Sequence, residues 1–157
     1  MYLLPFGIIS LAIVIFDFIT KQMVLKTMRL GQSIPLWKDV FHLTFVKNEG
    51  ASFGMLKGGR WFFVAITVLL VLYLLYYIVK NKEKNKLFLT ASAFIIGGGI
   101  GNLVDRVMTG EVVDFFDFCL IDFAIFNVAD CFVVIGAILA IIYFFVTEIK
   151  GKKNGRN

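Results

Sequence analysis

Four long apolar runs constrain the fold of this chain more than any other feature of its sequence. The predicted spans are residues 2–19, 61–79, 87–104 and 126–146. A helix rises about 1.5 Å per residue, so roughly 20 residues cross a hydrocarbon core about 30 Å thick. A membrane β-barrel would instead show alternating segments of about ten residues. The sequence therefore predicts a mainly α membrane protein with four transmembrane helices.

The composition fits the same class. Hydrophobic residues make up 59% of the chain and charged residues only 17%, whereas about a quarter of an average soluble domain is charged. The net charge of +5 does not indicate nucleic-acid binding, because the basic residues cluster at the ends of apolar runs, as they do beside membrane spans. The length suits one domain, so residues 1–157 are predicted to form a single integral membrane domain.

The first apolar run is interpreted as a retained span and not as a cleaved signal peptide. No basic segment precedes it, and Asp17 and Lys21 stand where a small-residue cleavage site is expected.

The distribution of lysine and arginine predicts the orientation. Lys80–Lys86, between the second and third spans, contains four lysines, and the tail at 150–157 holds four basic residues. The connection at 21–60 holds seven, but they are spread over forty positions. The density of positive charge therefore predicts that both termini lie in the cytoplasm.

The connection between the first two spans is predicted to form a small β-rich cap on the outer membrane surface, at about 28–58. His42–Val46 alternates loosely and is β-branched and aromatic. Asn48–Gly50 is typical of a turn, after which Ala51–Met55 is expected to return as a partner strand.

The stretch Gly97–Asp130 carries six of the eleven acidic residues and is bordered by apolar runs on both sides. Placing a charge in such surroundings costs several kcal/mol, so intramembrane acids indicate a functional site.

The predicted topology brings polar residues of three spans to one depth, at the outer ends of the helices. These residues are Asp17, Lys21, Asn102, Asp105, Arg106, Asn127 and Asp130. Gly97, Gly98, Gly99 and Gly101 would let the helices approach closely enough for these groups to meet, whether they serve packing or the site.

Two carboxylates held close together in a low dielectric cannot both ionise easily, so one retains a proton. Such a pair offers an acid and a base together and needs no metal. Five acids lie within reach by sequence alone: Asp105, Asp114, Asp117, Asp122 and Asp130. Apolar flanking residues favour Asp114 and Asp130.

The other three acids are interpreted differently. Asp105 adjoins Arg106 and is expected to form a structural ion pair with it, while Asp117 and Asp122 are expected to be solvated loop acids.

No metal or cofactor is predicted. Cys119 and Cys131 lack the paired spacing of a zinc site, and His42, the one histidine, cannot complete such a site. Both cysteines are interpreted as apolar side chains.

Five motifs together resemble those of the lipoprotein signal peptidases, the signal peptidase II family of bacterial intramembrane aspartic peptidases. They occur in the family's order across nearly the whole chain: Asp17–Lys21, Asn48–Gly54, Gly99–Arg106, Val112–Phe115 and Phe126–Asp130. One departure is a short segment between the last two motifs, and Glu49 and Ser52 fill the variable positions of the second. We expect this to alter the shape of a loop and not the chemistry.

The resemblance implies roles for individual residues. Asp114 and Asp130 match the catalytic dyad. The residues that match the family's substrate-binding or site-shaping positions are Asn48, Gly50, Asn102, Arg106 and Asn127. The residues that match structural polar positions are Asp17, Lys21 and Asp105.

The resemblance also implies a fold of four transmembrane helices with a small β-cradle on the outer face, and a monomer in the bacterial cytoplasmic membrane. The implied substrate is a prolipoprotein that carries diacylglycerol on a cysteine, cleaved just before that cysteine. Globomycin-type peptides would be inhibitors. A small proton-coupled transporter is the alternative function, although it would favour acids near the midplane and internal repeats. A non-catalytic scaffold that binds lipoproteins is a third.

Overall fold

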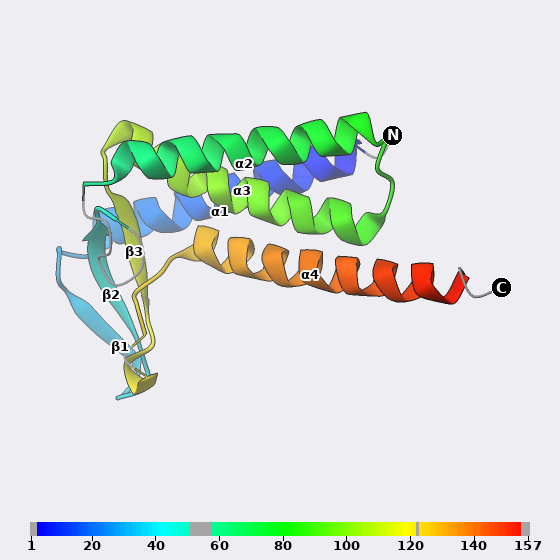
Figure 1. Cartoon of the computed structure of the whole chain (residues 1–157). Helices are drawn as coiled ribbons and strands as arrows, with labels where there is room; N and C mark the ends of the chain where they lie inside the picture. The colour runs from blue at the N-terminus through cyan, green and yellow to red at the C-terminus, as the bar shows by residue number, and fades with distance from the viewer. Residues whose placement is uncertain (1–2, 51–57, 122, 155–157) are drawn as a thin grey trace.

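The computed structural model describes residues 3–50, 58–121 and 123–154. Its elements in chain order are α1 (Leu3–Thr27), β1 (Ser33–Trp37), β2 (Phe41–Asn48), α2 (Arg60–Lys80), α3 (Lys86–Met108), β3 (Val112–Asp117), the 3-10 helix η2 (Cys119–Ile121) and α4 (Val128–Asn154). The four α-helices run lengthwise beside one another, and the sheet lies at one end of them (Figure 1). Both termini lie at the opposite end, as four consecutive crossings require.

All four helices are long and apolar enough to cross a membrane. Many of their large apolar side chains are exposed, as in a helix surface that faces lipid. The predicted class of four apolar helices with a small sheet is therefore confirmed. Helix α3 is the most enclosed of the four and packs against α1, α2 and α4.

The predicted span limits differ from the helices most in α1 and α4. Helix α1 continues to Thr27 instead of ending near residue 19, because Asp17 and Lys21 neutralise each other within the helix and do not end it. Helix α4 begins at Val128 and not at 126, and it runs to Asn154, so residues 150–154 of the predicted tail are helical.

The glycines of α3 lie where neighbouring helices come closest. A Cβ added to Gly98 would lie 2.4 Å from the Ala129 carbonyl oxygen of α4, and one added to Gly101 would lie 2.6 Å from Asp17 Oδ2 of α1. These separations are shorter than any side chain tolerates. The glycines therefore bring the α3 backbone against both helices and, at Gly101, against a polar residue.

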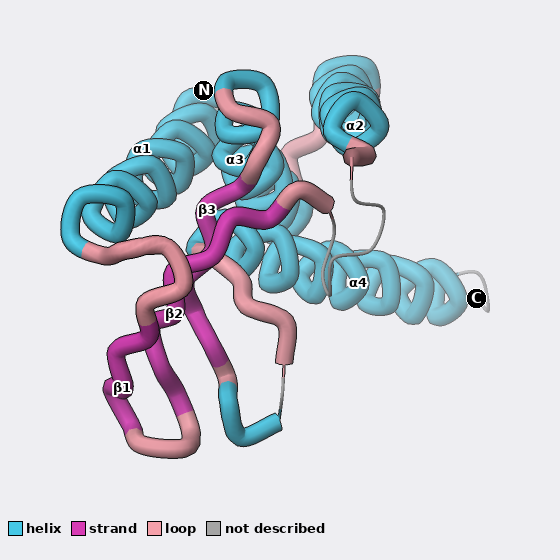
Figure 2. Tube along the Cα trace, turned by 90° about the vertical axis from the view of Figure 1, so that its left-hand side faces the viewer, coloured by secondary structure: helices cyan, strands magenta, loops and turns pink. Residues whose placement is uncertain are grey.

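The sheet is antiparallel in the order β1–β2–β3, and it extends away from the helix ends where α1 finishes and α4 begins (Figure 2). The strand predicted at His42–Val46 is confirmed within β2. Its partners are β1, which precedes it, and β3, which comes from the connection between α3 and α4. The predicted return strand at 51–55 lies outside the described residues, as does Asp122.

The segment after α3 thus supplies a strand of the sheet. Asp117 is a half-buried residue of β3 that accepts a hydrogen bond from Thr44 Oγ1, so its interpretation as a solvated loop acid was wrong. A buried apolar cluster attaches the sheet to the helices. It consists of Val24, Met28, Phe45, Val113, Phe115 and Val128. Because Val113 and Phe115 are anchored there, Asp114 between them is held at the junction of sheet and bundle.

Substitution Gly98→Ala should destabilise the protein by about 1–3 kcal/mol, because the added methyl group overpacks a contact with backbone that cannot move aside. The matched control is Gly7→Ala in α1, where an added Cβ meets nothing within 4 Å. Thermal unfolding in detergent measures both. Equal midpoints for the two variants would contradict the close contact between α3 and α4.

Candidate active site

Asp114 is almost fully buried, with 2% of its surface exposed. Asn48 Nδ2, at the end of β2, donates to its Oδ2 at 2.9 Å, and Asn127 Nδ2 donates to its Oδ1 at 2.7 Å. The Asn48 side chain is itself oriented by a turn in which Gly50 N donates to Asn48 Oδ1. Both oxygens of the carboxylate are thus occupied by amide donors that hold it in one rotamer.

Asp130 lies in the first turn of α4. Its backbone N–H donates to Asn127 Oδ1 at 3.0 Å, while Asn127 N donates to Asp130 Oδ2 at 3.1 Å. This reciprocal pair is a capping box, which satisfies free N–H groups at the start of a helix. Asn127 therefore precedes α4, whereas the predicted span at 126–146 had included it. Asn102 Nδ2 of α3 donates to the other oxygen, Asp130 Oδ1, at 2.7 Å.

Asn127 joins the two acids. Its side chain is fully buried and donates to Asp114, and its backbone N–H donates to Asp130. Asn102 Oδ1 accepts a further bond from Asn127 Nδ2 at 2.9 Å. One asparagine thus couples a carboxylate of the sheet to a carboxylate of the helix bundle.

A buried ion cluster lies behind these acids. Lys21 Nζ is 2.7 Å from Asp17 Oδ2 and 2.9 Å from Asp105 Oδ2. It also donates to Asn102 Oδ1 at 2.9 Å. Asp105 therefore pairs with Lys21 and not with Arg106, the partner that the sequence had suggested. Asp17, Lys21 and Asp105 are called the Lys21 cluster below. Within it the two carboxylates hold Lys21, and Lys21 in turn holds the Asn102 side chain.

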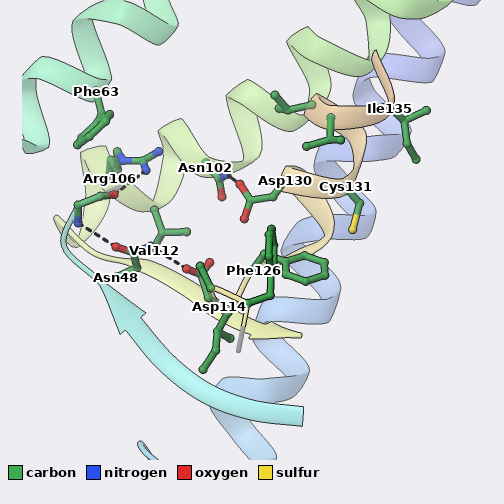
Figure 3. Close-up of a pocket in the computed structure, with 16 residues that line it drawn as sticks. Asn48, Phe63, Asn102, Arg106, Val112, Asp114, Phe126, Asp130, Cys131 and Ile135 are labelled. Atoms are coloured by element: carbon green, nitrogen blue, oxygen red, sulfur yellow. Dashed lines mark hydrogen bonds between the residues drawn. The ribbon is translucent and has the colours of Figure 1, made fainter. Parts of the chain in front are cut away.

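The acids face a cavity of about 540 Å³. Figure 3 shows Asp114 and Asp130 on opposite sides of it, one from β3 and one from α4. Six of the residues selected from the sequence line it: Asn48, Gly50, Asn102, Arg106, Asp114 and Asp130. Asn127, Asp17, Lys21 and Asp105 lie behind its wall.

Arg106 forms one end of the cavity. Its guanidinium donates to the Gly50 carbonyl oxygen at 3.3 Å and lies 5.0 Å from the centre of the Phe63 ring of α2. Arg106 thus connects α3 both to the end of β2 and to α2, with its charge beside the acids.

Much of the cavity wall was missed by the sequence reasoning. The apolar lining comes from Phe63, Phe123–Phe126, Cys131 and Val133–Ile135. The α4 part had a usable signal, because Val133 and Val134 follow Asp130 at spacings of three and four and so share its helix face. Phe63 had no such signal, because only packing brings α2 beside Arg106.

The environment of Asp114 raises its pKa to about 7, from an ordinary value of 3.8. Burial is the largest cause and the negative charge of Asp130 is the second, while the bonds from Asn48 and Asn127 act in the opposite direction. Asp114 therefore keeps its proton at pH values where an exposed aspartate has lost it. The pair can supply an acid and a base to the same bound molecule.

Among the described residues, one group of potential metal ligands lies outside this cavity, at the sheet. It consists of His42, Asp117 and Cys119. The spacing of the cysteines gave no sign of it.

A cavity that carries two carboxylates at one end of four apolar helices defines a multi-pass membrane protein with a site for acid–base chemistry. The model for the family described as signal peptidase (SPase) II matches residues 9–146 of the chain. The lipoprotein signal peptidase of Brevibacillus brevis is 45% identical over 94% of this chain and 97% of its own length. That of Bacillus subtilis is 39% identical over 92% and 96%, respectively. This chain therefore belongs to the signal peptidase II family, the lipoprotein signal peptidases.

A solved structure agrees with this assignment. A bacterial membrane enzyme determined by the in meso method at 2.3 Å resolution superposes with a TM-score of 0.84 and 38% identity. The match covers 90% of this chain and 87% of that one. Members of the family are proteases that cleave signal peptides from prolipoproteins, so the resemblance found in the sequence motifs is confirmed and a transporter is not favoured.

Substitution Lys21→Met should destabilise the protein by about 3–5 kcal/mol, because it leaves the Asp17 and Asp105 carboxylates without their buried partner. The control is Lys47→Met, which breaks an exposed pair with Glu111 and should cost no more than about 1 kcal/mol. Unfolding followed by circular dichroism in detergent compares the two. A similar loss in both variants would contradict the structural importance of the Lys21 cluster.

Proposed function

We propose that this chain is a metal-independent aspartic endopeptidase in which Asp114 and Asp130 form the catalytic dyad. The observation that carries the proposal is that both carboxylates face one cavity and are joined through Asn127. The raised pKa of Asp114 supports a dyad with one shared proton at neutral pH.

In the proposed reaction, the ionised carboxylate of the pair removes a proton from water as the water oxygen attacks the scissile carbonyl carbon. The protonated carboxyl donates its proton to the carbonyl oxygen, which gives a neutral tetrahedral intermediate. The carboxyl group that took a proton from water then donates it to the amide nitrogen, while the other carboxylate takes a proton from one hydroxyl group of the intermediate. The C–N bond breaks to give a carboxylic acid and an amine, and the dyad again holds one proton. Asn48, Asn102 and Asn127 act by holding the two carboxylates in position, and Arg106 lies where it can bind a substrate carbonyl.

The shape of the site supports the proposed substrate, a prolipoprotein with diacylglycerol on the cysteine that follows the scissile bond. Apolar side chains from Val133–Ile135 and Phe123–Phe126 line the cavity beside the acids. An extended signal peptide and an acyl chain are both mainly apolar, whereas a peptide bond needs the polar end of the cavity. We expect globomycin-type peptides to occupy the same space.

We further propose that the single domain at 1–157 is a monomer in the bacterial cytoplasmic membrane, with the cavity at the extracytoplasmic face. The termini and the lysine-rich Lys80–Lys86 connection lie at the end of the bundle opposite the sheet. Positive charge is retained on the cytoplasmic side, which supports placing the sheet and the dyad outside.

Substitutions Asp114→Asn and Asp130→Asn should each lower the rate of signal-peptide release by at least about 10²–10⁴-fold, since each removes one acid–base group. The assay uses purified protein and a diacylglyceryl-modified prolipoprotein in detergent. The control is Asp39→Asn, an exposed residue with a positive φ of 57° that asparagine adopts readily. Unimpaired cleavage by either dyad variant would overturn the assignment. Addition of EDTA should leave the wild-type rate unchanged.

The pH profile of kcat/KM should fall on the alkaline side with a midpoint near 7, where Asp114 loses the proton that the dyad needs. Asn48→Ala removes a hydrogen bond that favours the charged form, so the pKa of Asp114 rises and the midpoint should move to higher pH. Asn81→Ala, at the opposite end of the bundle, is the control and should leave the profile unchanged. A midpoint that moves to lower pH in Asn48→Ala would contradict the role assigned to Asp114.

A further inference from the structure

Three metal-binding side chains meet in the sheet, away from the catalytic cavity. His42 of β2 stands directly opposite Asp117 of β3 in the strand register, and Cys119 follows two residues later at the start of η2. One imidazole nitrogen, one carboxylate oxygen and the thiol sulfur all lie within 4.8 Å of one another. Ligands of one tetrahedral zinc ion are about 3.3–3.8 Å apart, since their bonds are about 2.0–2.3 Å long. Small side-chain rotations would close that difference.

A chain of hydrogen bonds runs from Asp117 through Thr44 and Ser33 to His42. Only one assignment of donors and acceptors along this chain is possible. Thr44 Oγ1 donates its single proton to Asp117 Oδ2. Thr44 Oγ1 must therefore accept from Ser33 Oγ, which lies 2.8 Å away. Ser33 has then used its own proton, so in its contact with His42 Nδ1 at 3.2 Å it must accept. His42 Nδ1 consequently carries the proton of the neutral ring.

This assignment leaves a lone pair on His42 Nε2. That atom is buried, and among the described residues it has no hydrogen-bond partner. A buried acceptor without a donor costs free energy, and native structures rarely retain one without a reason. A histidine that binds metal through one nitrogen and donates a hydrogen bond from the other shows the same arrangement.

We propose that His42, Asp117 and Cys119 form a binding site for a transition-metal ion of the Zn²⁺ class, here called the cradle metal site. Nitrogen, carboxylate oxygen and sulfur together suit Zn²⁺, whereas Mg²⁺ and Ca²⁺ prefer oxygen alone. Three protein ligands leave the fourth position for water. Thr44 and Ser33 act as positioning residues, because they orient the carboxylate and the imidazole.

The cradle metal site is structural and separate from the dyad. Asp117 and Asp114 are three residues apart in β3, so they point to opposite faces of the strand, about 10 Å apart along it. A bound ion would connect the beginning of β2, the end of β3 and η2. It therefore stabilises the sheet that carries Asp114 and Asn48 without contacting the substrate.

The test uses the full-length protein, purified in detergent without a histidine tag and stripped of metal by a chelator. Competition with a chromophoric chelator should show one Zn²⁺ bound per chain, and addition of Zn²⁺ should raise the midpoint of thermal unfolding. Co²⁺ should produce a thiolate-to-metal charge-transfer band. Wild-type protein with no bound Zn²⁺ and no such band would overturn the proposal.

Variants identify the ligands. Cys119→Ser should abolish the Co²⁺ thiolate band and the Zn²⁺-dependent rise in the unfolding midpoint. Cys131→Ser is the matched control, because it removes the other cysteine and should retain both signals. Ser33→Ala should weaken Zn²⁺ binding about 10–100-fold, as expected for a residue that orients a ligand. A band that survives in Cys119→Ser but disappears in Cys131→Ser would place the metal elsewhere and refute the site.

Cleavage assays separate this inference from the proposed mechanism. Cys119→Ser should still release signal peptide, which shows that the variant is folded. EDTA should lower the unfolding midpoint of the wild type but not that of Cys119→Ser. If EDTA instead stopped cleavage equally in both proteins, the metal-independent mechanism would fail, while the Zn²⁺ binding and unfolding data would still decide the cradle metal site.

Discussion

The geometry of the cavity that carries the two acids depends on one buried ammonium group. Lys21 Nζ contacts a carboxylate from its own helix, another from α3, and the side chain of Asn102. The other oxygen of Asp17 accepts a hydrogen bond from Ala129 N, at the start of α4. Lipid offers no water to replace any of these bonds, so the helices must supply them to one another. These bonds hold α1, α3 and α4 in one arrangement at this end of the bundle. Asn102, fixed by Lys21, in turn donates a hydrogen bond to Asp130 and so orients its carboxylate.

The cavity lies between the helix bundle and the sheet. The helices contribute Asp130, Asn102 and Arg106, and the sheet contributes Asp114 and Asn48. Asn127 bonds to both acids, so a shift of the sheet relative to the bundle would disturb both carboxylates at once. The same closeness accounts for the electrostatics, because the charge of Asp130 adds to burial in raising the pKa of Asp114. The contacts that bring Asp114 and Asp130 close together therefore also favour a state in which the pair retains one proton.

Local patterns predicted the parts of the fold that are local in the chain. A membrane span is a single continuous segment whose apolar length is visible directly, so all four helices were found. The strand β2 was also found, but its neighbours were not. The pairing of His42 with Asp117 joins residues more than 70 positions apart, and no local pattern encodes it. That pairing made Asp117 a strand residue and brought it to His42 and Cys119, a cluster that the cysteine spacing had given no reason to expect.

The sequence by itself determined the class of the protein, the end of the helices at which its polar residues gather and, through five ordered motifs, its family. Those properties follow from residue type and spacing along one segment at a time. Only the tertiary structure decided which groups are partners: that Asp105 pairs with Lys21 and not with its neighbour Arg106, and that Asn127 connects the two acids. The physical reason is that a buried charge or amide bonds to whichever group packing brings within about 3 Å. The residue spacing within one helix or strand does not predict how that element packs against the others.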